Sequence, residues 1–264
     1  MRRRLPATLI AAAMAVTACS SPDAGTGGPD GVLIRIDEVG GFLPFELALT
    51  AGPSFTLTTD GRLFTPGAVP AIYPGPLVYP YFVSQITPGH LGQIQTMIER
   101  IGLPDMDDVV EDTASDFLAD AGTTVITYWD SNGEHRFSVY ALGFADRASQ
   151  AAKDFAELRD VLQELSWRNE PTDYEPERFR VVAGQGMLDV DEDFVDVRPW
   201  PLPDTDLSSW SLVEHGWVCR AFGVEFLDQF LNASQVTRWT NPSQGSEDLT
   251  LYVRLLLPGE DNCP

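Results

Sequence analysis

Two Asx-Gly dipeptides, each set between β-rich runs, constrain the fold more than any other feature of this chain. Asp60-Gly61 lies between residues 55–59 and 62–64, and Asn132-Gly133 lies between residues 123–129 and 135–140. Glycine tolerates the positive φ of a type I′ turn, so such a dipeptide between two β-rich runs is a strong hairpin signal. We therefore predict two antiparallel hairpins.

A segment with helical periodicity follows each predicted hairpin. We expect the first helix to be capped by Thr87, to begin at Pro88 and to end at Gly102. Its apolar face would carry Leu91, Ile94, Ile98 and Ile101. The second spans about residues 147–167 and has an equally regular apolar face. The recurrence is either a weak internal repeat or the common way to cover one face of an antiparallel sheet, and we favour the second.

The C-terminal part has a mixed pattern. We predict a strand at residues 179–183, a third helix at about residues 220–232, and two paired strands at residues 236–240 and 249–256. The acidic stretch 105–120 is expected to be a loop, with a partly helical stretch as the alternative, and the proline- and charge-rich residues 169–177 a boundary. The sequence thus indicates an α+β fold of antiparallel sheets built from hairpins, with about three helices packed on one face. Residues 31–168 would form a hairpin-helix-hairpin-helix domain, and residues 178–264 a smaller α+β domain or an extension of it.

The beginning of the chain has the pattern of a secretory signal. Arg2, Arg3 and Arg4 precede an apolar run at residues 5–16, which is shorter than the about 20 residues needed to span a bilayer. The run ends in Val16-Thr17-Ala18-Cys19, which resembles a bacterial lipobox. That resemblance implies removal of residues 1–18 and a diacylglyceryl group on Cys19. The protein would then be held by lipid on the outer face of the cytoplasmic membrane, with residues 19–30 as a flexible tether reaching about 18 Å.

Two cysteines remain after Cys19. An exported chain meets an oxidising environment, so Cys219 and Cys263 are predicted to form a disulfide with Cα atoms about 4.4–6.8 Å apart. The bridge would connect the C-terminus to the start of the predicted third helix.

Charge excludes one large class of partners. The chain has 17 basic and 39 acidic residues, and removal of the three arginines in residues 1–18 takes the net charge from −22 to −25. Such a surface repels phosphate, so we expect no nucleic-acid binding.

The residues that usually carry catalysis form no recognisable motif. Ser149 and Lys153 are four residues apart, whereas a Ser-Lys hydrolase needs three, and none of His90, His135 and His215 lies in a metalloprotease motif. Residues 189, 191 and 193 are aspartates with the spacing of a calcium loop, but Phe194 takes the place of the required glycine. We expect no metal and no cofactor.

The proline-rich connector at residues 73–82 is the candidate binding segment. Aromatic side chains on a chain stiffened by proline can bind sugars, peptides or another protein at low entropic cost. The candidate binding residues are Tyr73, Tyr79, Tyr81 and Phe82. The alternative is that these rings only pack the connector onto the sheet.

Several segments together resemble a group of uncharacterised secreted lipoproteins of high-GC Gram-positive bacteria. They are residues 60–62 (DGR), 73–77 (YPGPL), 140–143 (YALG) and 253–260 (VRLLLPGE). The resemblance implies no activity, cofactor or catalytic residue. We therefore expect a lipid-anchored, non-enzymatic envelope protein that binds an unknown ligand or envelope partner. The alternatives are a structural coat protein and a cell-envelope hydrolase, which would need two carboxylates about 5–5.5 or 6.5–9.5 Å apart in one cleft.

Overall fold

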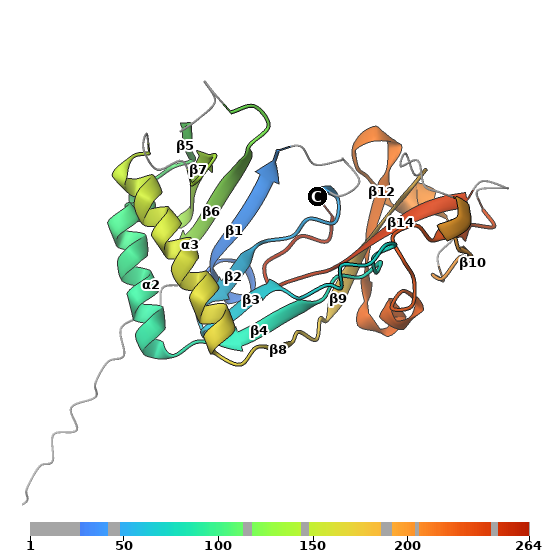
Figure 1. The fold of residues 1–264 in the computed structure, drawn as a ribbon, viewed down its shortest axis with the longest axis horizontal. Coiled ribbons are helices and arrows are strands. Elements are labelled where there is room, and N and C mark those ends of the chain that lie inside the picture. The colour runs from blue at the N-terminus through green and yellow to red at the C-terminus, as the bar shows by residue number, and fades with distance from the viewer. Residues whose placement is uncertain are drawn as a thin grey trace, which may run out of the picture.

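The computed structural model describes residues 27–41, 48–112, 118–143, 148–185, 192–203, 206–243 and 248–263. The leader, Cys19 and residues 19–26 of the predicted tether lie outside these ranges. The described residues form two β-sheets, mostly antiparallel, with two long helices lying against the first sheet (Figure 1). This agrees with the predicted α+β class.

The first sheet is built around the two predicted hairpins. Its strand order is β5-β7-β6-β1-β2-β3-β4-β8, and every neighbouring pair is antiparallel except β5 and β7. The strands are β1 Val32–Gly40, β2 Phe55–Thr58, β3 Arg62–Pro66, β4 Tyr81–Gln85, β5 Val109–Asp112, β6 Gly122–Asp130, β7 Gly133–Tyr140 and β8 Thr172–Asp173. Both hairpins are confirmed, since Leu57 pairs with Leu63 across the first turn and Asp130 with Gly133 across the second.

The acidic stretch after the first helix is more ordered than predicted. Residues Leu103–Asp105 form a 3-10 turn, and Val109–Asp112 form β5 at the edge of the sheet. β5 runs parallel to β7, with Val109 opposite Phe137. A four-residue edge strand shows little alternation, which is why the sequence alone favoured a loop.

Side-chain caps define where the two helices begin. In α2, Pro88–Ile101, the Thr87 hydroxyl accepts from the amide of His90, and Gly102 ends the helix at φ 84°. In α3, Gln150–Arg168, the Ser149 hydroxyl accepts from the amide of Ala152 at 3.1 Å. The second helix therefore begins later than the predicted residue 147, because the cap satisfies an amide that the helix itself leaves free.

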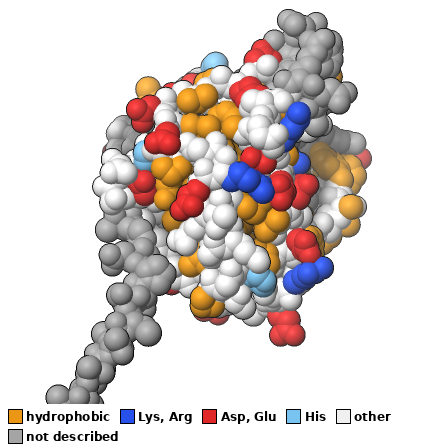
Figure 2. Space-filling view, turned by 90° about the vertical axis from the view of Figure 1, so that its left-hand side faces the viewer, with side chains coloured by type: hydrophobic (Ala, Val, Ile, Leu, Met, Phe, Trp, Pro, Cys, Tyr) orange, Lys and Arg blue, Asp and Glu red, His pale blue; other side chains and the backbone are white. Residues whose placement is uncertain are grey.

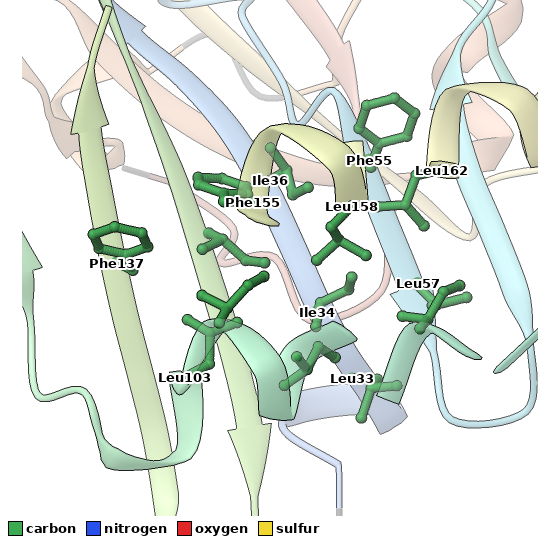
Figure 3. Close-up of a cluster of buried hydrophobic side chains, with 14 of the residues drawn as sticks. Leu33, Ile34, Ile36, Phe55, Leu57, Leu103, Phe137, Phe155, Leu158 and Leu162 are labelled. Atoms are coloured by element: carbon green, nitrogen blue, oxygen red, sulfur yellow. The ribbon is translucent and has the colours of Figure 1, made fainter. Parts of the chain in front are cut away.

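The apolar faces of both helices belong to the same core as the first sheet. Ile94 and Ile98 of α2 join Phe155 and Leu158 of α3 in one buried cluster with side chains of β1, β2, β6 and β7. Figure 3 shows the α3 side chains beside Ile34 and Ile36 of β1 and Phe55 and Leu57 of β2. Burying a side chain of this kind is worth about 1.5–3 kcal/mol, so this packing holds α3 against the sheet.

The second sheet has the order β10-β13-β14-β9-β12-β11, with only β10 and β13 parallel. Its strands are β9 Arg178–Gly184, β10 Val197–Pro199, β11 Ser211–Leu212, β12 Val218–Gly223, β13 Arg238–Thr240 and β14 Asp248–Leu255. The predicted strand at residues 179–183 is confirmed as β9, and the predicted pairing near the C-terminus is confirmed as β13 with β14.

The third predicted helix is wrong. Residues 218–223 form β12, which pairs with β9, and only Val224–Gln229 turn as a 3-10 helix. Phe222 and Phe230 both pack on Phe179, with ring centroids 6.0 and 5.6 Å away. Aromatic residues fit a half-buried pleated surface well, so packing between strands outweighs the helical spacing of these phenylalanines.

The disulfide is present, but it joins different elements from those expected. Cys219 lies in β12, and its Cα is 5.8 Å from that of Cys263, which follows β14. The bridge thus connects the C-terminal segment to a strand of the second sheet.

The connector and the predicted boundary both link the two sheets. Val78 of the connector forms a bridge with Val253 of β14, and the amide of Leu77 donates to the carbonyl of Ala233. The amide of Tyr174 donates to the carbonyl of Tyr81, so part of the predicted boundary continues the edge of the first sheet. Phe64, Leu77 and Tyr81 share one buried cluster with side chains of β9 and β14.

Candidate functional site

The four candidate binding residues of the connector do not form one surface. Tyr73 is 62% exposed, and its ring lies edge-on against Phe194 at 5.4 Å. Tyr79 is half-buried, and its hydroxyl accepts from the side-chain amide of Gln235. Phe82 is also half-buried and lines a groove on the first sheet.

Tyr81 corrects the expectation of a surface ring. It is 5% exposed, opens β4 opposite Pro66 and packs in the cluster between the sheets. Burial raises the pKa of its hydroxyl, against the opposing effect of the nearby Arg254. For Tyr81 the packing alternative is therefore correct, because the connector passes between the two sheets.

The groove beside Phe82 is the best candidate for a binding site. It has a volume of about 500 Å³, within the range of about 300–1,000 Å³ typical of ligand pockets. We call it the α3 groove, because α3 forms one wall and the ends of β1 to β4 form the other. Its apolar side chains are Phe55, Pro66, Phe82, Trp167 and Pro171.

The helical wall carries a regular row of side chains. Arg159, Gln163 and Trp167 are spaced four residues apart in α3, so they lie above one another on one stripe of the helix. Trp167 is 68% exposed, which is unusual for the largest apolar side chain. An indole ring held on a rigid helix at the rim of a groove can contact a ligand with little loss of entropy.

Charged groups of both signs line the same groove. On the helix, the guanidinium of Arg159 lies 3.6 Å from the carboxylate of Asp160. On the opposite wall, the exposed Glu38 accepts a hydrogen bond of 2.8 Å from the hydroxyl of Thr124. The groove therefore offers donors and acceptors together and has no excess of positive charge.

The groove lies at the end of the first sheet that is opposite the start of β1. The first described residues lead into β1 at Val32, whereas Glu38 is six residues further along that strand. At about 3.3 Å per residue, this separates the groove from the start of β1 by about 20 Å. Pro66 and Phe82 support the same placement of the groove, since both lie near the end of the β3–β4 pair opposite the Asp60-Gly61 turn.

A second cluster of charged groups is structural. Arg180 and Arg254 lie buried side by side in β9 and β14 and donate to the carbonyls of Leu49 and Ala51. Burial, reinforced by the nearby Arg180, lowers the pKa of Arg254 to about 10. These contacts hold the segment before β2 against the second sheet.

The remaining polar residues singled out in the sequence have structural surroundings. Ser149 caps α3, and its hydroxyl also donates to Glu111. His135 is buried, with its Nε2 3.0 Å from the Asp130 carboxylate, whereas His215 is exposed. Of the predicted calcium-loop positions, residues 189 and 191 lie outside the described ranges, and Asp193 is exposed. Within the described ranges, no group of three or more histidine, cysteine, aspartate or glutamate side chains is placed to hold a metal ion.

No protein-family model matches the chain, and searches of curated proteins and of solved structures likewise find no match. Function is therefore inferred from the groove itself.

Of the groove residues, only Phe82 is predicted from the sequence to bind a ligand. A signal was present for the helical wall, since residues 159, 163 and 167 repeat every four positions beside the buried face of α3. No comparable signal marks Glu38, because it reaches the groove only through the pairing of β1 with its neighbours.

Proposed function

We propose that this chain is an exported protein, attached by lipid at Cys19 to the outer face of the cytoplasmic membrane, that binds a ligand in the α3 groove without transforming it. The observation that carries the binding function is Trp167, which is 68% exposed on the wall of a groove of about 500 Å³. The lipobox-like residues 16–19 support the anchor.

The position of the groove supports the same proposal. A tether at residues 19–30 would enter the fold beside the start of β1, and the groove lies about 20 Å away along that strand. A protein anchored in this way presents the groove away from its attachment point. None of the helices in the described ranges is long and apolar enough to cross a membrane.

The anchor is tested by fractionating cells of a Gram-positive host that express the full chain. The unmodified protein should be found in the membrane fraction and partition into detergent, because two acyl chains hold a protein stably. Cys19→Ala should be released or remain uncleaved, whereas the neighbouring Ser20→Ala should behave as the unmodified protein does. A mature Cys19→Ala variant that stays on the membrane would contradict the anchor.

The binding function is tested separately with the purified full chain. A panel of neutral trisaccharides and of tripeptides is titrated by calorimetry into the unmodified protein and Trp167→Ala. Saturable binding of any panel member that is lost in Trp167→Ala supports the function. The matched control is Phe194→Ala, which removes an exposed ring outside the groove.

One observation favours a hydrolase as the second candidate. Glu38 and Asp160 both line the α3 groove, and glycosidases use two carboxylates in one cleft. Incubation with the same trisaccharides distinguishes the two functions. Release of new reducing ends that disappears in both Glu38→Gln and Asp160→Asn would replace binding with hydrolysis.

A further inference from the structure

We infer that the ligand of the α3 groove is a neutral carbohydrate, with the Trp167 ring as the surface on which one sugar ring stacks. This inference rests on the proposed binding function and adds the chemical class of the ligand. It comes from three properties of the groove: an exposed indole, planar hydrogen-bonding side chains beside it, and the balance of charge.

The exposed indole suits the apolar face of a sugar. Its ring carries partial negative charge on its faces, whereas the C–H bonds on one side of a pyranose are slightly positive. The described part of the chain gives Trp167 no aromatic partner of its own: the ring pairs of the second sheet involve Trp200, Trp210, Trp217 and Trp239. Its exposed face is therefore available to a ligand.

The side chains next to Trp167 suit the hydroxyl groups of a sugar. Gln163 is one helical turn away and offers both a donor and an acceptor, and Arg159 one turn further offers donors in a planar fork. Glu38 and Ser54 face them from the strand side. A sugar hydroxyl both donates and accepts, so it can satisfy neighbouring groups of either kind.

The charge of the groove disfavours the main competing ligands. Its charged side chains are two acids and one arginine, in a chain of net charge −22, so an anionic ligand would be repelled. Figure 2 shows acidic side chains spread over one face of the molecule without a continuous basic area. A lipid chain is disfavoured for another reason, because it would take the charged side chains of Glu38 and Arg159 out of water and offer them no hydrogen bonds in return.

The test is calorimetric titration of the purified full chain with maltotriose, cellotriose and chitotriose, beside trialanine and an acidic trisaccharide. We expect at least one neutral trisaccharide to bind saturably and the acidic one to bind at least tenfold more weakly. Trp167→Ala should weaken binding at least tenfold, and Trp167→Phe should restore most of it, because a ring remains. Gln163→Ala should weaken it several-fold, and the control Phe194→Ala, which removes an exposed ring outside the groove, should stay within twofold. Unchanged melting temperatures show that the variants are folded.

The outcomes separate this inference from the proposed function. If trialanine binds at Trp167 and no neutral trisaccharide does, the carbohydrate inference is overturned while the binding function stands. If a trisaccharide binds equally well to Trp167→Ala, the sugar lies elsewhere and the inference is again overturned. If nothing in the panel binds to a folded protein, both the inference and the binding function are rejected.

Discussion

The guanidinium of Arg254 and the carboxylate of Glu260 form an ion pair in which each side chain is only 8% exposed. The second carboxylate oxygen of Glu260 accepts from the amide of Leu257 at 2.9 Å, so one glutamate both pairs the arginine and shapes the turn after β14. Arg254 in turn donates to the carbonyl of Ala51 from the first half of the chain. The pair thus joins the C-terminal segment to the segment before β2.

Removing one partner of this pair should be costly. Glu260→Gln keeps the size of the side chain and an oxygen for the Leu257 amide, but it leaves the arginine charge buried without its carboxylate. Breaking a buried pair in this way costs about 3–5 kcal/mol. We expect a loss of that size in the free energy of unfolding, measured with urea.

The double variant Arg254→Met/Glu260→Gln provides the control. With the arginine charge removed, the second substitution should cost much less than it does alone, so the two effects should not be additive. Additive losses would show that the two side chains are not coupled.

The turn of the second hairpin should respond to acid through Asp130. Burial by itself would raise the pKa of this carboxyl, but hydrogen bonds from the Asn132 amide and the His135 ring hold the pKa below its ordinary 3.8. Because the folded-state pKa is depressed, the stabilising contribution is present above pH 3.8 and is lost as the pH falls through the folded-state value.

Asp130→Asn tests this linkage, since it removes the charge and keeps the shape of the side chain. At pH 7 its melting temperature should be lower by about 2–4 °C, the shift expected for about 1 kcal/mol in a protein of this size. Below the folded-state pKa, the difference from the unmodified protein should vanish. A difference that keeps the same size while the pH is lowered from 7 until the carboxyl is protonated would mean that the charge contributes nothing.

The disulfide should stabilise the second sheet. Cys219 and Cys263 close a loop of 44 residues, for which chain entropy gives about 4 kcal/mol at most. We expect Cys219→Ala/Cys263→Ala to lose about 2–4 kcal/mol, measured by urea unfolding, and reduction of the unmodified protein to cause a similar loss. If reduction leaves the stability unchanged, the bridge does not stabilise the protein by lowering the entropy of the unfolded chain.

The parts of the fold predicted correctly are those specified by nearby residues. The turn glycines Gly61 and Gly133 and the cap Thr87 act within a few positions of themselves, so their elements are visible in the sequence. The third predicted helix failed because Phe222 and Phe230 pack on Phe179, some 40 or more positions away.

The candidate site could not be predicted from the sequence because it too depends on contacts between distant residues. Glu38, Phe82 and Trp167 meet only after the first sheet has formed and α3 has packed on it. The connector gave the opposite error, because its aromatic residues suggested a surface where Tyr81 is in fact buried between the sheets.

Two residues of the connector should therefore differ in how much their replacement by alanine lowers the free energy of unfolding. Leu77 is 2% exposed, lies in the cluster between the sheets, and its amide donates to Ala233 of the second half. Leu77→Ala should leave a cavity and cost about 2–5 kcal/mol of unfolding free energy. Tyr73→Ala, four residues earlier, removes a ring that is 62% exposed and should change the stability by no more than about 0.5 kcal/mol. Urea unfolding of both variants measures the contrast. Equal losses would show that the connector does not hold the sheets together through Leu77.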